Sequence, residues 1–103
     1  MTAFGSYLSD RWLELNLYQA EFCRRVGKPA GWIQQIRQGT KTPPMGDMPG
    51  WAVVLELLGA ERQYFFDLAA IAHLPAEVQD RFLKMVRFDC KVVKSSTPKE
   101  QKP

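Results

Sequence analysis

Glutamine is concentrated on one short predicted helix that lies between Gly27 and Gly39. If Ile33 and Ile36 face the interior, a step of about 100° per residue turns a different set of residues outward. That outward set consists of amides and one glycine: Gly31, Gln34, Gln35 and Gln38. A solvated helix face normally carries Lys and Glu, whereas a glutamine carboxamide can both donate to and accept from an adenine. The chemistry predicted for this face is therefore hydrogen bonding to base edges.

Positive charge is concentrated in the same stretch. Residues 17–41 contain one acidic residue, Glu21, and five basic residues. The basic residues are Arg24, Arg25, Lys28, Arg37 and Lys41. Residues 42–90 contain four basic and seven acidic residues, and the whole chain has a net charge of +3. The positive region thus coincides with the amide face, as binding to phosphates requires.

Two short helices joined by a tight turn must position these side chains. The sequence predicts helices over residues 18–26 and 29–38, with apolar residues between them: Phe22, Cys23, Val26, Ile33 and Ile36. Gly27 is expected at the turn because a side chain there would obstruct the close approach of two helices. Pro29 is acceptable in the first turn of a helix, and Gly39 ends the second one. This is the pattern of a helix-turn-helix, whose second helix lies in the DNA major groove.

Helices are also predicted on both sides of this unit. A helix over residues 2–15 has Thr2 as its N-cap and Asn16 at its end, and its apolar stripe is Phe4, Leu8, Trp12 and Leu15. A loop over residues 40–50 follows the unit. Pro49 opens a fourth helix that Gly59 ends, with Trp51, Val54, Leu55 and Leu58 expected inside. A fifth helix over residues 60–72 presents Phe65, Leu68, Ala69 and Ala72. Tyr64 and Phe66 lie off that stripe, as surface aromatics or as part of a subunit contact.

The last predicted helix follows Pro75 and has an apolar line of Val78, Phe82, Met85 and Val86. It either completes the core or forms a dimer seam. Residues 88–93 fit both a strand alternation and a continuing helix, and the pattern does not separate the two. The segment 94–103 lacks apolar residues and is predicted to be a disordered basic tail. The fold expected is all-α: a compact bundle of five to six short helices in one domain, residues 1–93, followed by that tail.

Several classes of protein are disfavoured by the composition. No apolar run approaches the roughly 20 residues that span a bilayer, and no basic-then-apolar leader begins the chain, so a cytoplasmic location is expected. Cys23 and Cys90 are far apart and His73 is the sole histidine, so neither a metal site nor another cofactor is predicted. Carboxylates such as Glu56 and Asp67 have no partner spaced to share acid–base chemistry. The chain is not expected to be an enzyme.

The order of these residues resembles the lambda-repressor-like helix-turn-helix family (Cro/repressor type, XRE). The positions that carry the resemblance are Phe4-Gly5, Leu8, Leu17, Gln19, Phe22-Cys23, Val26-Gly27, Ile33, Ile36, Gly39 and Pro43. The family's usual string has Leu-Ser-Gln-x-x-Leu-Ala-x-x-Leu-Gly, then Ile-Ser-x-Ile-Glu-x-Gly and a nearby proline. The spacing holds without a gap from Phe4 to Pro43, about two-fifths of the chain. The fourth and fifth helices also resemble the family's, after an insertion of about three residues in the 44–50 loop.

The resemblance implies a role for each matched residue. Gln19 matches the glutamine that touches phosphate and braces the recognition helix. Ala30, Gly31, Gln34 and Gln35 match positions that face bases, and Trp32 flanks them. Lys28, Arg37, Gln38 and Lys41 are expected to reach phosphates. The family typically binds double-stranded DNA as a homodimer on a palindromic operator and represses transcription, often in phage, plasmid or toxin–antitoxin contexts.

Some residues depart from the family's pattern. Tyr18 replaces the usual serine N-cap, at a cost on the order of 1 kcal/mol, and Pro29 replaces another capping residue. Ala30 and Gly31 offer no polar side chain to bases, and Arg11 stands where an apolar residue is common. These departures leave open an alternative: a protein-interaction module on the same fold, such as an antitoxin subunit or an inhibitor of another protein. Trp32, Tyr64 and Phe66 would be its anchors.

Overall fold

The computed structural model of the chain describes the backbone of residues 2–96 and the side chains of residues 2–86. Its elements are α1 (Ala3–Glu14), α2 (Gln19–Val26), α3 (Ala30–Gln38), the short 3₁₀ turn η1 (Met45–Asp47), α4 (Met48–Val54), α5 (Gly59–Ile71) and α6 (Ala76–Ser96). No strand occurs within residues 2–96. The prediction of a compact all-α bundle of five to six short helices is confirmed.

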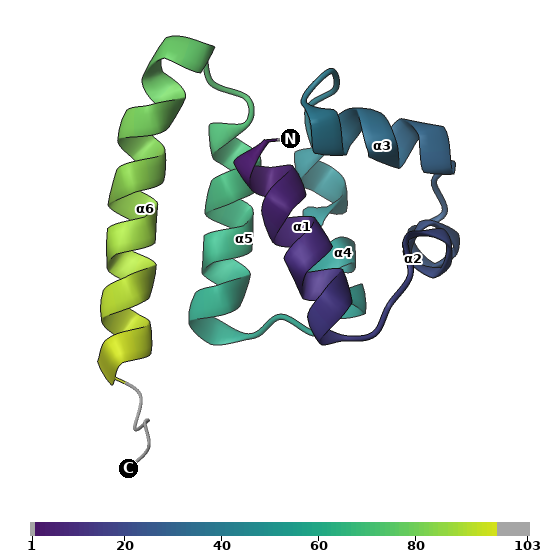
Figure 1. Cartoon of the computed structure of the whole chain (residues 1–103), viewed down its shortest axis with the longest axis horizontal. Coiled ribbons are helices and arrows are strands. Elements are labelled where there is room, and N and C mark those ends of the chain that lie inside the picture. The colour runs from purple at the N-terminus through teal and green to yellow at the C-terminus, as the bar shows by residue number, and fades with distance from the viewer. Residues whose placement is uncertain (1, 97–103) are drawn as a thin grey trace.

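The helices surround one aromatic core. Helix α1 packs against α3 and α5, α2 packs against α3 and α4, and α6 lies alongside α5 on the outer side of the bundle (Figure 1). Phe4, Leu8 and Trp12 of α1 are buried, as their spacing predicted. The ring centroid of Phe4 lies 5.3 Å from that of Phe65 in α5. The ring of Trp12 lies 5.2 Å from Phe22 in α2, so α1 joins the two halves of the core.

Local chemistry sets the ends of α1, as predicted. The side chain of Thr2 caps the first turn, where its Oγ1 accepts a hydrogen bond from the Gly5 amide at 3.0 Å. Just past the other end, Asn16 adopts a left-handed φ of 55°. Asparagine tolerates this conformation better than most residues, and the chain can turn there into α2.

The link between α4 and α5 differs from the prediction. Glu56, with a φ of 58°, makes the left-handed turn after α4, and Gly59 is the first residue of α5. This earlier turn brings Leu57 into the core at 3% exposure and leaves Leu58 outside at 81%. Val54, expected inside, is half-buried. The expected burial of Leu58 is therefore wrong by one residue, because the helix ends before the apolar repeat does.

Helix α5 contributes its predicted stripe with one change. Phe65, Leu68 and Ala69 are buried, but Ile71 is buried where Ala72 was expected, and Ala72 is half-buried. Tyr64 and Phe66 are half-buried against the core and are not free surface aromatics. The ring of Tyr64 meets that of Tyr7 edge-on at 5.2 Å.

Helix α6 runs without a break to Ser96, so residues 88–93 are helical and so are 94–96, which were assigned to the tail. The remainder of that predicted tail, 97–103, lies outside the described residues. Val78 and Val86 are half-buried, whereas Phe82 and Met85 are exposed at 44% and 62%, so the apolar line only partly faces the bundle.

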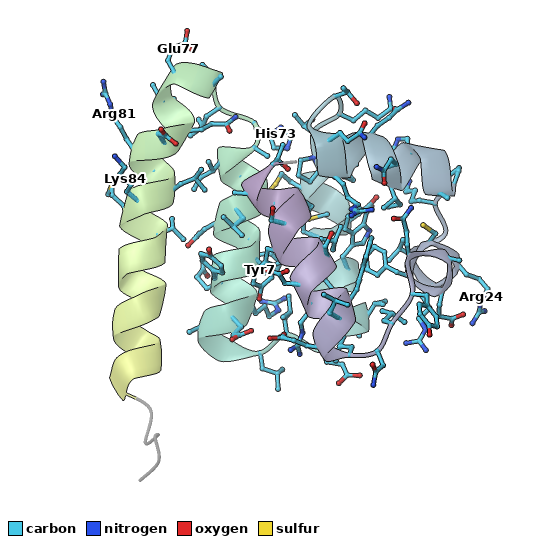
Figure 2. The ribbon with its side chains drawn as sticks, viewed as in Figure 1. Tyr7, Arg24, His73, Glu77, Arg81 and Lys84 are labelled. Atoms are coloured by element: carbon cyan, nitrogen blue, oxygen red, sulfur yellow. The ribbon has the colours of Figure 1, made fainter. Side chains whose placement is uncertain are left out.

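The far side of α6 is charged. Glu77, Arg81 and Lys84 point outward from the side of the helix that faces away from α5 (Figure 2). Within the described part of the chain, no helix is long and apolar enough to cross a membrane.

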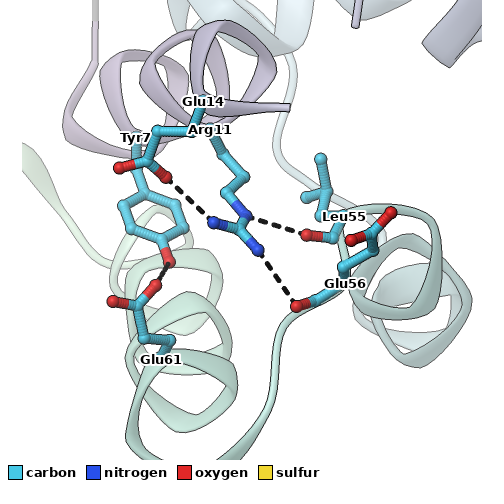
Figure 3. A network of polar contacts seen from close by, with 6 residues as sticks. All are labelled: Tyr7, Arg11, Glu14, Leu55, Glu56 and Glu61. Carbon is cyan, nitrogen blue, oxygen red and sulfur yellow. Dashed lines mark hydrogen bonds and ion pairs between the residues drawn. The ribbon is translucent and has the colours of Figure 1, made fainter. Parts of the chain in front are cut away.

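Arg11 explains one departure from the family's pattern. Its Nε donates to the carbonyl oxygen of Leu55 at 2.8 Å and its Nη2 to that of Glu56 at 3.0 Å (Figure 3). Its Nη1 also donates to the Glu14 carboxylate at 3.0 Å. Carbonyl groups at the end of a helix lack intrahelical partners, and a cation there is favourable. Arg11 thus ties the end of α1 to the end of α4.

Candidate nucleic-acid interface

The glutamine-rich helix α3 is held at a steep angle to α2. Figure 1 shows α2 end-on while α3 lies in the plane of the picture. Phe22 and Cys23 of α2 and Ile33 and Ile36 of α3 are buried between the helices and the rest of the core. This leaves the opposite side of α3 at the surface of the molecule.

Gly27 makes the turn between these helices for a reason other than the predicted one. Its φ is 72°, which a glycine adopts without strain, and a Cβ there would have no atom within 4 Å. The close approach occurs instead at Gly5 in α1. A Cβ on Gly5 would lie 2.4 Å from the Arg37 carbonyl oxygen, so the absence of a side chain lets α1 press against α3.

Four of the five residues predicted to face bases lie on or beside the outer face of α3. Ala30, Gly31 and Gln35 are exposed, and Gln34 is half-buried. The side chain of Gln35 makes no hydrogen bond to another described residue. The start of the helix is open, because nothing lies within 4 Å of where a Gly31 Cβ would be. The exposed amide of Gln35 is therefore available to a partner.

Trp32, the fifth of these residues, faces elsewhere. Its ring is half-buried and meets the buried ring of Trp51 edge-on, with centroids 6.2 Å apart. The ammonium of Lys28 lies 4.8 Å from the Trp32 ring centroid and 3.7 Å from the Asp47 carboxylate. Packing against Trp51 thus directs the indole toward the core, and the contact of Trp32 with bases stays a prediction.

Arg37, expected to reach outward to phosphate, turns back toward α2. Its Nη1 donates to Gln19 Oε1 at 2.5 Å and to Gln34 Oε1 at 2.9 Å. The guanidinium carbon lies 5.2 Å from the ring centroid of Trp12. Gln19 therefore braces α3 as the resemblance implied, through Arg37. This link was not predicted, although the three-residue spacing of Gln34 and Arg37 on one helix is a usable signal for it.

The cations of the positive region are mostly paired. Arg24 and Arg25 both contact the Glu21 carboxylate, the latter through Nε at 2.9 Å. These hydrogen bonds, first that of Arg24 and then that of Arg25, lower the pKa of Glu21 below its ordinary value and keep it ionised. Gln38 and Lys41 are exposed at the end of α3, and Lys41 has no ion pair within residues 2–86. Lys41 is thus an exposed cation of the positive region that is available to a polyanion.

Cys23 is a core thiol, as expected. It is buried, and burial raises the pKa of its thiol above the ordinary value because a thiolate there would lose its hydration. His73 Nε2 lies 2.6 Å from the Pro43 carbonyl oxygen, so this nitrogen donates to the loop before η1. Among the described residues, no group of three His, Cys, Asp or Glu side chains is placed to hold a metal ion.

Comparison of the chain with models of protein families, with curated proteins and with solved structures finds no significant match.

Proposed function

We propose that this chain is a sequence-specific DNA-binding regulator that represses transcription as a homodimer on a palindromic operator. The observation that carries the proposal is the outer face of α3, which is exposed, open at its start and amide-bearing in its second half. No Asp or Glu occurs from Lys28 to Lys41. A helix without acidic groups can enter the major groove, about 12 Å wide, without repulsion from the phosphates on either side.

In this proposal the small residues and the amides of α3 have different roles. Ala30 and Gly31 let the backbone of α3 approach the base edges closely. Gln35 supplies a carboxamide for direct readout, while Gln38 and Lys41 reach phosphates at the end of the helix. A helix of nine residues meets only a few base pairs, and a second copy on a symmetric site doubles the number that is read. A protein with this function works in the cytoplasm, together with the DNA.

Selection of duplexes from a randomised pool tests the proposal directly. The wild-type protein is expected to enrich a sequence with two symmetric half-sites. Gln35→Ala should weaken binding to the selected duplex by about 5- to 150-fold, which corresponds to one bidentate base contact of roughly 1–3 kcal/mol. Gln63→Ala is the matched control, since this exposed amide lies on α5 and bonds to Asp67 at 2.9 Å. Equal affinities for the two variants would refute readout by α3.

Exposed apolar side chains favour a second, compatible function in protein binding. Leu13 near the end of α1, Val53 near the end of α4 and Leu58 in the link to α5 are exposed. The end of α1 and this link lie at one end of the bundle, away from α3 (Figure 1). Exposed apolar patches mark interaction sites. The three aromatic anchors expected from the sequence, Trp32, Tyr64 and Phe66, are half-buried against the core and are less suited to this role.

Sedimentation velocity distinguishes whether this apolar end forms the homodimer or binds another protein. If it forms the homodimer, Leu58→Asp should shift the protein to monomer, whereas Met85→Asp on α6 should not. If it binds another protein such as a toxin, the wild type sediments as a monomer until that protein is added. A dimer that only Met85→Asp dissociates would place the subunit contact on α6 instead.

A further inference from the structure

The Arg37 guanidinium decides which atoms of two glutamines face outward. Each hydrogen of its Nη1 is directed at a carboxamide oxygen, that of Gln19 in α2 at 2.5 Å and that of Gln34 in α3 at 2.9 Å. A guanidinium has only donors. Both carboxamides must therefore turn their oxygen toward Arg37 and their NH₂ group away from it.

Arg37 is itself held in place by α1. Its guanidinium lies over the Trp12 ring, 5.2 Å from the centroid. Its Nε is buried and has no hydrogen-bond partner within the described part of the chain. Its carbonyl oxygen accepts from the backbone N and the Oγ1 of Thr2, at 3.1 and 3.2 Å. The orientation imposed on Gln34 is thus built into the packing of α1, α2 and α3.

We infer that Arg37 is a positioning residue that makes Gln34 read DNA through its NH₂ group. This inference rests on the proposed function. Arg37 takes one of the two lone pairs of the Gln34 oxygen and holds that oxygen on its own side, so Gln34 would have to share the oxygen to form the donor–acceptor pair with adenine that a free glutamine forms. Its outward NH₂ group donates to base acceptors in the major groove: purine N7, guanine O6 or thymine O4. Gln35, which has no such partner, is the residue that makes the adenine pair.

The same constraint applies to Gln19. Its NH₂ group, turned away from Arg37, is a suitable donor to a phosphate oxygen, and an oxygen turned outward would be repelled there. One arginine that touches no DNA thus presets one amide for phosphate and another for a base acceptor. Neither glutamine has to rotate on binding, which lowers the entropic cost of the complex.

Duplex selection with two variants tests the inference through base preference. Duplexes selected by the wild type should carry guanine more often than adenine at the base pair contacted by Gln34, because guanine presents two acceptors in the major groove and adenine one. Arg37→Met keeps an apolar stem on Trp12 but releases Gln34, and enrichment of adenine at that base pair should rise about fivefold or more. Gln34→Lys is the matched control, since a lysine donates and has no acceptor, and this variant should retain the wild-type preference.

Three results of the duplex selection would overturn different parts of the proposal. If Arg37→Met binds all sequences more weakly but with an unchanged preference, Arg37 is only structural and the inference is overturned. If Gln34→Lys loses the guanine preference, the reading of this base through the NH₂ group of Gln34 is overturned as well, and this arm does not depend on the folding of the Arg37 variant. If wild type enriches no sequence, the proposed function itself fails.

A measurement without DNA tests the geometry independently. In ¹⁵N-edited NMR spectra of the free protein, the side-chain amide signals of Gln19 and Gln34 should move in Arg37→Met. The signal of Gln63, on α5, should stay in place. Unmoved signals for Gln19 and Gln34 would show that the contacts to Arg37 do not exist in solution, whatever the DNA results.

Discussion

Replacing Gly5 by alanine tests the packing of α1 on the proposed recognition helix. Gly5 lies within α1 and is buried. A Cβ at this position would lie 2.4 Å from the carbonyl oxygen, 2.9 Å from the Cα and 3.0 Å from the carbonyl carbon of Arg37. All three atoms are backbone, so no side-chain rotation can relieve the contact. Helix α1 must move away from α3.

The expected magnitude follows from two opposing contributions. Alanine is favoured over glycine inside a helix by roughly 0.5–1 kcal/mol. Overpacking costs typically about 1–3 kcal/mol, and moving α1 also weakens the two hydrogen bonds from Thr2 to the Arg37 carbonyl, each contributing about 0.5–1.5 kcal/mol. The steric and hydrogen-bond losses exceed the helix gain, so the free energy of unfolding should fall by about 2 kcal/mol.

Gly31→Ala is the matched control, since this helical glycine is exposed and a Cβ there would meet nothing within 4 Å. It should stabilise the protein by about 0.5–1 kcal/mol. Thermal melts followed by circular dichroism should therefore move in opposite directions, with Tm lower by about 8–16 °C for Gly5→Ala and higher by about 2–8 °C for Gly31→Ala. A Gly5→Ala protein as stable as wild type would refute the tight contact between α1 and α3.

Three further predictions concern other contacts. Arg11→Met should lower the free energy of unfolding, measured in urea, by about 1–3 kcal/mol, because two carbonyl oxygens lose a charged donor. Glu14→Gln is the control: it breaks only an exposed ion pair and should change the free energy of unfolding by less than about 0.5 kcal/mol. In a Cys90→Ser background, the buried thiol of Cys23 should react slowly with iodoacetamide at pH 8, because its raised pKa disfavours the thiolate. The reaction should become rapid once urea unfolds the chain, and equal rates for the folded and unfolded protein would contradict the burial of Cys23. Lys41→Ala should weaken binding to all duplexes alike and reduce the salt slope of log K by about one, as the loss of one phosphate contact requires.

Local residue chemistry accounts for what could be predicted without a structure. Thr2, Asn16, Gly27 and Gly39 end or begin helices through interactions within a few residues of themselves, so their effects depend little on the rest of the chain. The apolar stripe of α1 follows from the helical period alone. These signals were sufficient for the all-α class and for the succession of helices.

Contacts between distant segments could be resolved only by the tertiary structure. The sequence does not show that Gly5, and not Gly27, is the glycine that allows two helices to touch, because that depends on where the Arg37 carbonyl lies. It places Leu58 inside, whereas Leu57 is the buried residue, since the helical period gives no warning that Glu56 turns the chain early.

The proposed interface shows the same division. Its helix, its amides and its excess of positive charge were readable from residues 17–41, because type and spacing are properties of the sequence. The direction of Arg37 was not readable, since the two amide oxygens and the Trp12 ring that attract it come from three helices. Folding thus turned a predicted phosphate contact into the residue that orients Gln19 and Gln34.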